Sequence, residues 1–265
     1  MPRANRHFIP GQIWHITHRC HRREFLLKFA KDRQRWLGWL FEARKRFGLS
    51  ILDFMVTSNH VHLLVSGDND RSVIPRSMQL IAGRTGQEYN QRKNRKGAFW
   101  EDRYHATAVE SGSHLIQCLV YIDLNMVRAG VVSHPQEWPY SGYNEIQTPR
   151  ERYVLIDHER LMGLTGVKSQ QDFKELHTSW IDEGLAKGNP FRDDRWTESL
   201  AVGGEAFVKE IRETLGAKAG GRSVISDGEQ QQLRDLQQPY TTYFAPEKAL
   251  LNQNIGLKWN VYPDV

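Results

Sequence analysis

Cysteine is scarce in this chain. Only Cys20 and Cys118 occur among the 265 residues, which is too few for a disulfide framework, and no Cys-x-x-Cys spacing is present. Because structural disulfides persist mainly in oxidising compartments, we expect two buried thiols in a reducing one.

Long apolar runs are missing as well. No stretch approaches the roughly 18 apolar residues that a membrane-spanning helix needs, and residues 1–11 (MPRANRHFIPG) lack the apolar centre of a signal peptide. With 39% hydrophobic and 25% charged residues, the composition is typical of a globular protein. We expect a cytoplasmic protein with no membrane partner, built as one domain with an appendage or as two small domains.

Positive charge is concentrated in the first part of the chain. Residues 1–150 hold 22 Lys and Arg against 13 Asp and Glu, whereas residues 151–265 hold 14 against 18, so a segment of +9 precedes one of −4. Basic clusters occur at residues 19–23, 44–46 and 92–96. This excess is the pattern of a polyanion binder, but solvated helix faces produce similar runs, so charge alone leaves both interpretations open.

Residues 57–65 (TSNHVHLLV) contain two histidines separated by one residue. The segment predicts a β-strand, on which His60 and His62 share a face because side chains alternate with a period of two. Such neighbours lie about 7 Å apart at Cα, close enough for both rings to converge on a metal ion or a phosphate. The alternative is an exposed histidine pair on a solvated strand.

The surrounding sequence alternates strand and helix patterns. Strands are predicted at residues 12–19, 49–56 and 98–110, and helices at 28–47, with Gly48 as the cap, and at 72–94. The tight turn at Ser58 and Asn59 makes the strand before it and the histidine strand an antiparallel hairpin. On the first strand His15 and His18 face opposite sides, which disfavours a second metal cluster there.

One more helix is predicted from Ser111 or Ser113 to Ala129. Apolar residues give it a buried stripe, and Tyr121 and Asn125 lie one turn apart on another face. A solvated face with an amphipathic tyrosine is the alternative interpretation.

A tyrosine and a histidine pair together point to phosphodiester chemistry. A tyrosine hydroxyl, with a free pKa of about 10, can attack a DNA phosphate when a metal ion neutralises the phosphate oxygens and orients the attack. The cut strand then stays covalently attached to the enzyme. Two neutral imidazoles and an amide oxygen add no negative charge beside the phosphate, although ligand softness alone favours zinc, manganese or nickel over magnesium.

Four segments occur in a characteristic order: WHITHR at 14–19, SNHVHLL at 58–64, FWEDRYH at 99–105 and YIDLNMVRAG at 121–130. Together they resemble the REP-associated tyrosine transposases, relatives of the single-tyrosine transposases in the His-hydrophobe-His endonuclease superfamily. The resemblance covers about residues 5 to 145. It implies an α+β fold, with a ferredoxin-like antiparallel sheet and packed helices.

The resemblance also implies roles for individual residues. His60 and His62 match the metal-binding pair, and Tyr121 matches the nucleophile. Asn125 matches the polar residue that completes metal coordination. The implied ion is Mg²⁺ or Mn²⁺, and the implied substrate is single-stranded DNA beside the hairpin of a repetitive extragenic palindrome. Met126 stands where relatives usually carry proline, a departure that concerns the helix geometry beside the site.

Other residues and functions are weighed against this assignment. Tyr104 competes as nucleophile, but it lies in a predicted strand, and relatives carry an aromatic residue there that is commonly not tyrosine. Five arginines near the motifs are expected to contact DNA phosphates: Arg19, Arg22, Arg84, Arg103 and Arg128.

Two other functions are alternatives to a DNA-cleaving transposase: a non-cleaving DNA-binding repressor and a zinc-dependent hydrolase. The retained histidines and tyrosine argue against the first, and the lack of a nearby acidic ligand or His-Glu-x-x-His helix argues against the second.

The sequence divides into a catalytic domain at 1–148 and an extension at 149–265, expected to be mostly helical and partly flexible. Helices are predicted at 170–185 and 199–215, with a flexible joint at 217–221. Charge predicts that the acidic extension packs against the basic domain and that the tail beyond Pro239 partly covers the DNA channel; an independent appendage is the alternative. Monomer and homodimer both stay open.

Overall fold

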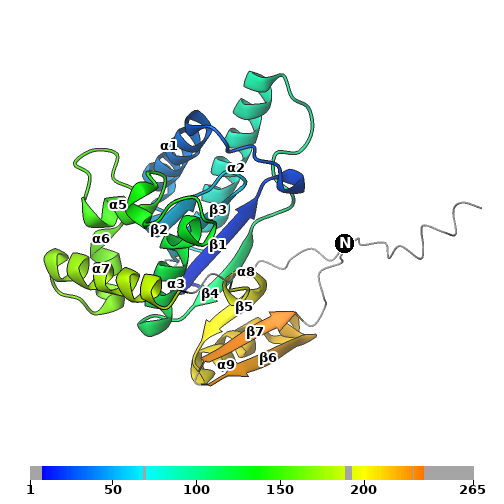
Figure 1. Ribbon diagram of the computed structural model, residues 1–265. Helices are drawn as coiled ribbons and strands as arrows, with labels where there is room; N and C mark the ends of the chain where they lie inside the picture. The colour runs from blue at the N-terminus through cyan, green and yellow to red at the C-terminus, as the bar shows by residue number, and fades with distance from the viewer. Residues whose placement is uncertain (1–7, 68–69, 189–192, 229, 236–265) are drawn as a thin grey trace, which may run out of the picture. The chain divides into compact units, whose positions relative to one another are not determined.

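A computed structural model describes residues 8–67, 70–188, 193–228 and 230–235. Its strands form a seven-stranded sheet in the order β2-β3-β1-β4-β5-β7-β6 within these residues (Figure 1). The strands are β1 (Ile13–Arg19), β2 (Ser50–Val56), β3 (His60–Ser66), β4 (His105–Val109), β5 (Ser199–Gly203), β6 (Arg222–Asp227) and β7 (Gln230–Asp235). The tail beyond Pro239, predicted to cover the DNA channel, lies outside the described residues.

The helices between and after the strands include α1 (Ala30–Phe47), α2 (Val73–Lys93), α3 (Ser113–Asp123), α4 (Asn125–Arg128), α5 (Gly142–Gln147), α6 (His158–Thr165), α7 (Gln170–Ala186), α8 (Arg195–Glu198) and α9 (Glu205–Leu215). Short 3₁₀ turns occur at His21–Arg23, Pro135–Glu137 and Gly216–Ala219. No helix in the described part of the chain has the length and apolar character that a membrane span requires.

The first four strands form the predicted ferredoxin-like unit. Their order along the chain is β1-α1-β2-β3-α2-β4, and β1 lies between β3 and β4 with antiparallel pairing to both. Strand β2 pairs antiparallel with β3 through the predicted hairpin. Helix α1 ends where predicted, because Gly48 takes the left-handed conformation (φ 70°) and donates its N–H to the Arg44 carbonyl. The α+β fold class is therefore confirmed.

Opposite faces of this sheet carry different helices. The ring of His18 stacks on Trp100, and the Trp100 indole N–H donates to the Ala82 carbonyl, so α2 and its neighbour α1 cover the His18 face. The ring of Tyr121 lies beside His62, so α3 covers the face that carries the histidine pair. Both predicted buried thiols, Cys20 and Cys118, are buried and unbridged.

Several predicted boundaries are wrong. The strand predicted at 98–110 forms only at His105–Val109. The residues before it form a loop, in which Trp100 makes an isolated antiparallel bridge with Cys20, the residue after β1. The helix predicted up to Ala129 is divided at Leu124, whose ψ of 4° interrupts the α-helical path between α3 and α4.

The extension contains strands that its sequence pattern did not predict. The helix predicted at 199–215 begins only at Glu205, because Ser199–Gly203 pairs with β4 as a parallel strand. Gly203 permits this path, since a Cβ there would lie 2.4 Å from the Phe207 ring and 2.9 Å from Glu110. Strands β6 and β7 continue the sheet beyond β5. The predicted flexible joint at 217–221 contains most of the 3₁₀ turn Gly216–Ala219 and ends one residue before β6.

Buried polar groups join the extension to α3. His177 of α7 places Nε2 2.9 Å from the Asp123 carboxylate, and both side chains are fully buried. The extension therefore packs against the first part, as predicted, through a shared sheet and a buried His–Asp pair.

A neighbouring carboxyl group, that of Asp53 on β2, gives a stability prediction. Burial, together with the charge of Asp123, raises the pKa of the Asp53 carboxyl well above its usual range. Above the unfolded-state pKa, unfolding releases the retained proton, so this group lowers stability as the pH rises. Asp53→Asn keeps the acceptor for the Phe54 N–H, which lies 2.7 Å away. We expect its free energy of unfolding, relative to the wild type, to increase with pH by up to about 1.4 kcal/mol per unit.

Urea unfolding of both proteins between about pH 4 and about pH 8 measures this difference. A difference that stays constant with pH would show that Asp53 is ionised in the folded protein.

Candidate active site

The four residues predicted for catalysis and metal binding lie together. His60 and His62 project from the same face of β3, with their ring centroids 5.0 Å apart. The Tyr121 ring of α3 lies 5.8 Å from that of His62, and the Asn125 amide nitrogen lies 3.0 Å from His62 Nε2. A strand motif and a helix motif about 60 residues apart in the sequence thus meet in one cluster.

The hydrogen bonds of His60 determine where its lone pair is. Its Nδ1 lies 2.7 Å from the Asn59 side-chain oxygen, which can only accept, and 2.9 Å from Thr57 Oγ1. Thr57 Oγ1 is itself placed to donate to the His60 carbonyl at 2.8 Å. Nδ1 is therefore the protonated nitrogen, and the lone pair of the neutral ring is on Nε2.

His62 shows the same preference. The Asn125 amide nitrogen donates to its Nε2, so Nε2 holds the lone pair and Nδ1 holds the proton. The Nε2 atom of His15 lies 2.9 Å from Nδ1 of His62. Only 2% of His62 is exposed, which leaves the imidazole in a largely dry environment.

This donor set fits a divalent metal ion. The described residues contain no group of three or more His, Cys, Asp or Glu side chains that could hold one, so an ion here would depend on two imidazoles and a neutral amide. The two Nε2 lone pairs are the nitrogen ligands. Asn125 would have to turn its amide so that the oxygen replaces the nitrogen toward the ion.

Tyr121 is covered on both sides. Only 7% of the residue is exposed. The Arg128 guanidinium lies 4.3 Å from the ring centroid and donates to the Tyr121 carbonyl at 2.5 Å, while the Trp196 ring of α8 lies 6.2 Å away. Burial lowers the pKa of the Arg128 guanidinium. The structure thus places Arg128, predicted as a phosphate contact, against the predicted nucleophile.

The other predicted arginines are spread over the molecule. Arg19 lies opposite His60 in the β1–β3 register. Arg22 and Arg103 are exposed, one in the 3₁₀ turn after β1 and the other in the loop before β4. Arg84 belongs to α2, with its guanidinium 4.7 Å from the Trp39 ring centroid and 3.8 Å from Glu88. Arg19 and Arg128 therefore adjoin the cluster, whereas Arg84 contacts α1.

Tyr104, the competing nucleophile, lies elsewhere. It is 5% exposed, and its ring packs edge-on to His18 at 6.2 Å, on the face opposite the histidine pair. Its position therefore favours Tyr121.

His15 is a site residue that sequence reasoning missed. It is fully buried on β1, its ring lies parallel to that of His62 with centroids 5.1 Å apart, and it meets Tyr121 edge-on at 6.1 Å. Burial lowers the pKa of His15 to about 3. The alternation of β1 predicted which side His15 faces, but only the pairing of Thr17 with His62 shows that this side is that of the histidine pair.

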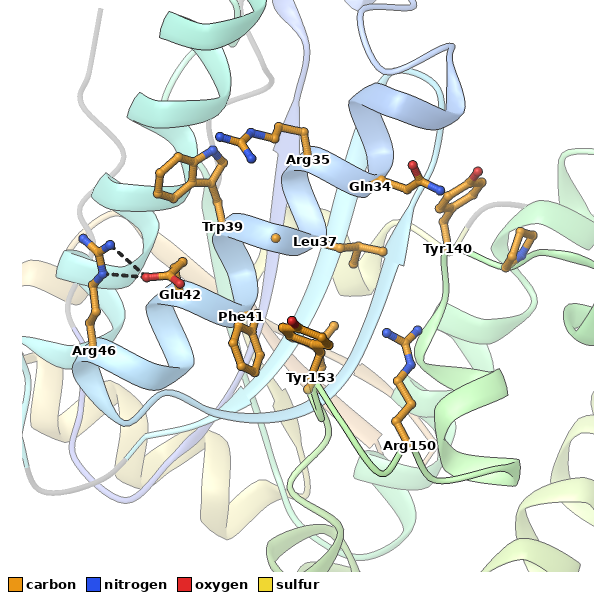
Figure 2. Close-up of a pocket in the computed structure, with 13 residues that line it drawn as sticks. Gln34, Arg35, Leu37, Trp39, Phe41, Glu42, Arg46, Tyr140, Arg150 and Tyr153 are labelled. Atoms are coloured by element: carbon orange, nitrogen blue, oxygen red, sulfur yellow. Dashed lines mark hydrogen bonds and ion pairs between the residues drawn. The ribbon is translucent and has the colours of Figure 1, made fainter.

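A large pocket lies away from this cluster. Its volume is about 970 Å³, and α1 lines it together with residues 139–155; Trp39, Phe41 and Tyr153 supply aromatic surface (Figure 2). None of the predicted site residues lines it. Three arginines at the pocket all have acidic partners, namely Arg35 with Glu88, Arg46 with Glu42 and Arg150 with Glu145. The pocket therefore offers no evident phosphate site.

The chain is similar to a family model in sequence and to solved proteins in structure. Two solved structures resemble the chain. One is a REP-associated tyrosine transposase bound to a REP hairpin (21% identity, 56% of this chain, 87% of the other, TM-score 0.46). The other is a putative transposase from Deinococcus radiodurans R1 (16% identity, 48% and 95% coverage, TM-score 0.33). No curated protein matches the chain.

Residues 10–125 match the family model described as "Transposase IS200 like". The matched segment contains all four clustered residues, His60, His62, Tyr121 and Asn125, and ends at the last of them. This part of the chain is similar to the IS200-like transposases.

Proposed function

We propose that the chain is a metal-dependent endonuclease and strand transferase of single-stranded DNA, which cuts beside palindromic hairpins through a covalent phosphotyrosine intermediate. The observation that carries this proposal is the meeting of Tyr121 with His60, His62 and Asn125 in one cluster. Its substrate, a repetitive extragenic palindrome, follows from the resemblance of the four sequence segments to the REP-associated transposases.

The reaction is a transesterification in which bonds and protons balance. The Tyr121 oxygen attacks a backbone phosphorus and loses its proton, while the bond from phosphorus to a sugar oxygen breaks and that oxygen takes up a proton. A sugar hydroxyl attacking the phosphotyrosine would restore the phenol and join the strands. A bound Mg²⁺ or Mn²⁺ would neutralise the phosphate oxygens and align the attack.

Residues of this chain would prepare the nucleophile and the metal site. The Arg128 guanidinium, 4.3 Å from the centroid of the Tyr121 ring, would stabilise the negative charge of a phenolate. The hydrogen bonds of His60 and His62 place the lone pair of each neutral ring on Nε2. Two neutral imidazoles and an amide would add no negative charge beside the phosphate.

The burial of Tyr121 supports a second candidate function. With 7% exposure and a tryptophan of α8 beside its ring, Tyr121 needs a local rearrangement before a phosphate can reach it. A DNA-binding repressor that never cuts would need no such rearrangement.

One experiment separates the two functions. The full chain is incubated with Mn²⁺ and labelled single-stranded DNA that carries a hairpin, and the products are separated on a denaturing gel. We expect a band in which labelled DNA migrates with the protein after denaturation. DNA binding in native gels without such an adduct, across several hairpin sequences, would instead support the repressor.

Salt dependence tests how the DNA is held. If lysines and arginines of the +9 segment contact phosphates, log affinity falls linearly with log salt, by about 0.7 per contact on single strands. Arg103→Ala removes an exposed guanidinium beside β4 and should lower this slope by about one contact.

Arg46→Ala is the matched control for the salt experiment. It removes the same charge from α1, where Arg46 is paired with Glu42 four residues earlier. The slope of log affinity against log salt for Arg46→Ala should equal that of the wild type. Equal losses in both variants would show that net charge, and not a defined contact, sets the affinity.

A further inference from the structure

The imidazole of His15 is hydrogen-bonded at both nitrogens although it is fully buried. Its Nδ1 lies 2.8 Å from the main-chain oxygen of Trp196, and its Nε2 lies 2.9 Å from Nδ1 of His62. The ring therefore bridges a strand of the transposase segment, a predicted metal ligand and a helix of the extension.

The direction of each hydrogen bond follows from the chemistry of the end groups. The Trp196 carbonyl can only accept, so His15 Nδ1 carries a proton. No carboxylate of the described residues hydrogen-bonds to this buried ring, so it is neutral and its Nε2 holds a lone pair that accepts the Nδ1 proton of His62. His62 is thereby left with its lone pair on Nε2, the nitrogen that faces Asn125. The Trp196 carbonyl at one end of these hydrogen bonds and the Asn125 amide at the other therefore require the same tautomer of His62.

Packing holds the Trp196 carbonyl, which accepts the hydrogen bond from His15, in place. The Trp196 carbonyl belongs to α8, next to β5, and Thr107 Oγ1 of β4 lies 2.6 Å from the Ser199 carbonyl and 3.3 Å from that of Trp196. The rings of His15 and His62 are nearly parallel, with an interplanar angle of 6°, and their facing nitrogens lie 2.9 Å apart. Rotation of either imidazole would therefore break this hydrogen bond.

We propose that His15 is a positioning residue that fixes the tautomer and orientation of His62, with the main-chain carbonyl of Trp196 in the extension as its anchor. A metal-bound histidine is commonly oriented by an acceptor at its second nitrogen, and losing that acceptor typically costs 10- to 100-fold in metal affinity. Here the acceptor is another imidazole, itself oriented by a segment outside the matched family region. The extension would thereby become part of the metal site, and this consequence rests on the proposed function.

The tautomer can be measured without metal or DNA. In the wild-type full chain, the ¹⁵N chemical shifts of His62 should show a protonated Nδ1 and an unprotonated Nε2. His15→Phe keeps an aromatic ring but offers no acceptor, so we expect a mixture of His62 tautomers. A calorimetric titration with Mn²⁺ alone should show affinity lower by about 10- to 100-fold.

Two further variants separate positioning from general loss of structure. His15→Gln supplies a side-chain oxygen that can accept from His62 Nδ1, so it should recover part of the Mn²⁺ affinity. His18→Ala removes an imidazole from the opposite face of β1, where it stacks on Trp100, and leaves His15 intact. Its Mn²⁺ affinity should stay within about threefold, well below the loss expected for an oriented ligand.

The results that overturn the proposal are distinct from failure of the proposed function. A protonated Nε2 on His62 in the wild type would overturn it, even if the variants do not fold. Unchanged tautomer and Mn²⁺ affinity in folded His15→Phe would do the same. If the wild type forms no covalent DNA adduct but shows the expected tautomer, the proposed function fails and the positioning of His62 by His15 stands.

Discussion

Replacing Tyr121 with phenylalanine is expected to abolish the covalent protein–DNA adduct while leaving DNA affinity within a few fold. The substitution removes only the hydroxyl, so the ring still packs against Arg128, His62 and Trp196. No other group in the cluster can form a stable phosphodiester with DNA, and loss of the nucleophile should remove the chemical step rather than binding. A denaturing gel measures the adduct, and a filter-binding titration measures affinity.

Tyr104→Phe is the matched control for this experiment. It removes the same hydroxyl from a buried tyrosine on the opposite face of the sheet, beside His18. Adduct formation should continue in this variant. If the adduct persists in Tyr121→Phe and disappears in Tyr104→Phe, the nucleophile has been assigned to the wrong tyrosine.

The single variants His60→Ala and His62→Ala should each reduce cleavage to the background level. Both imidazoles would hold the same ion, so removal of either leaves a site that cannot clamp the phosphate. The double variant should be scarcely worse than either single one, because residues that act as a unit are not additive. Excess EDTA should reproduce the effect in the wild type, and rates from single-turnover assays provide the comparison.

His18→Ala controls for the loss of a histidine from the same sheet. Its ring stacks on Trp100 and bonds to the Asp102 carbonyl on the opposite face, so a folded variant should still cut DNA. Undiminished cleavage by the wild type in excess EDTA would show that the histidine pair does not act through a metal ion. If the fold losses in cleavage rate of the two single variants multiply in the double variant, His60 and His62 act separately.

The parts of this site governed by local rules were predictable from sequence. Strand alternation put His60 and His62 on one face, and helical spacing put Tyr121 and Asn125 on one side. The hairpin and the Gly48 cap depend on a few neighbouring residues, so they too were predictable. These signals come from within single elements.

The features that were missed depend on distant partners. Strand β5 forms because Ser199–Gly203 finds an open edge at β4, a partner about 90 residues earlier in the chain, and no periodicity within the segment records that edge. The bond between His15 and Trp196 spans 181 positions. The division at Leu124 likewise separates Tyr121 and Asn125 into two helices, although the expected juxtaposition survives.

Identification of the residue joined to DNA is the most direct test of the account. The adduct formed by the full chain with hairpin-bearing single-stranded DNA and Mn²⁺ would be purified under denaturing conditions, digested with nuclease and protease, and analysed by tandem mass spectrometry. The account predicts one modified peptide, with a nucleotide phosphate on the Tyr121 side chain. A phosphate on Tyr104 or on any other residue, or no modified peptide from DNA that has been cut, would contradict it.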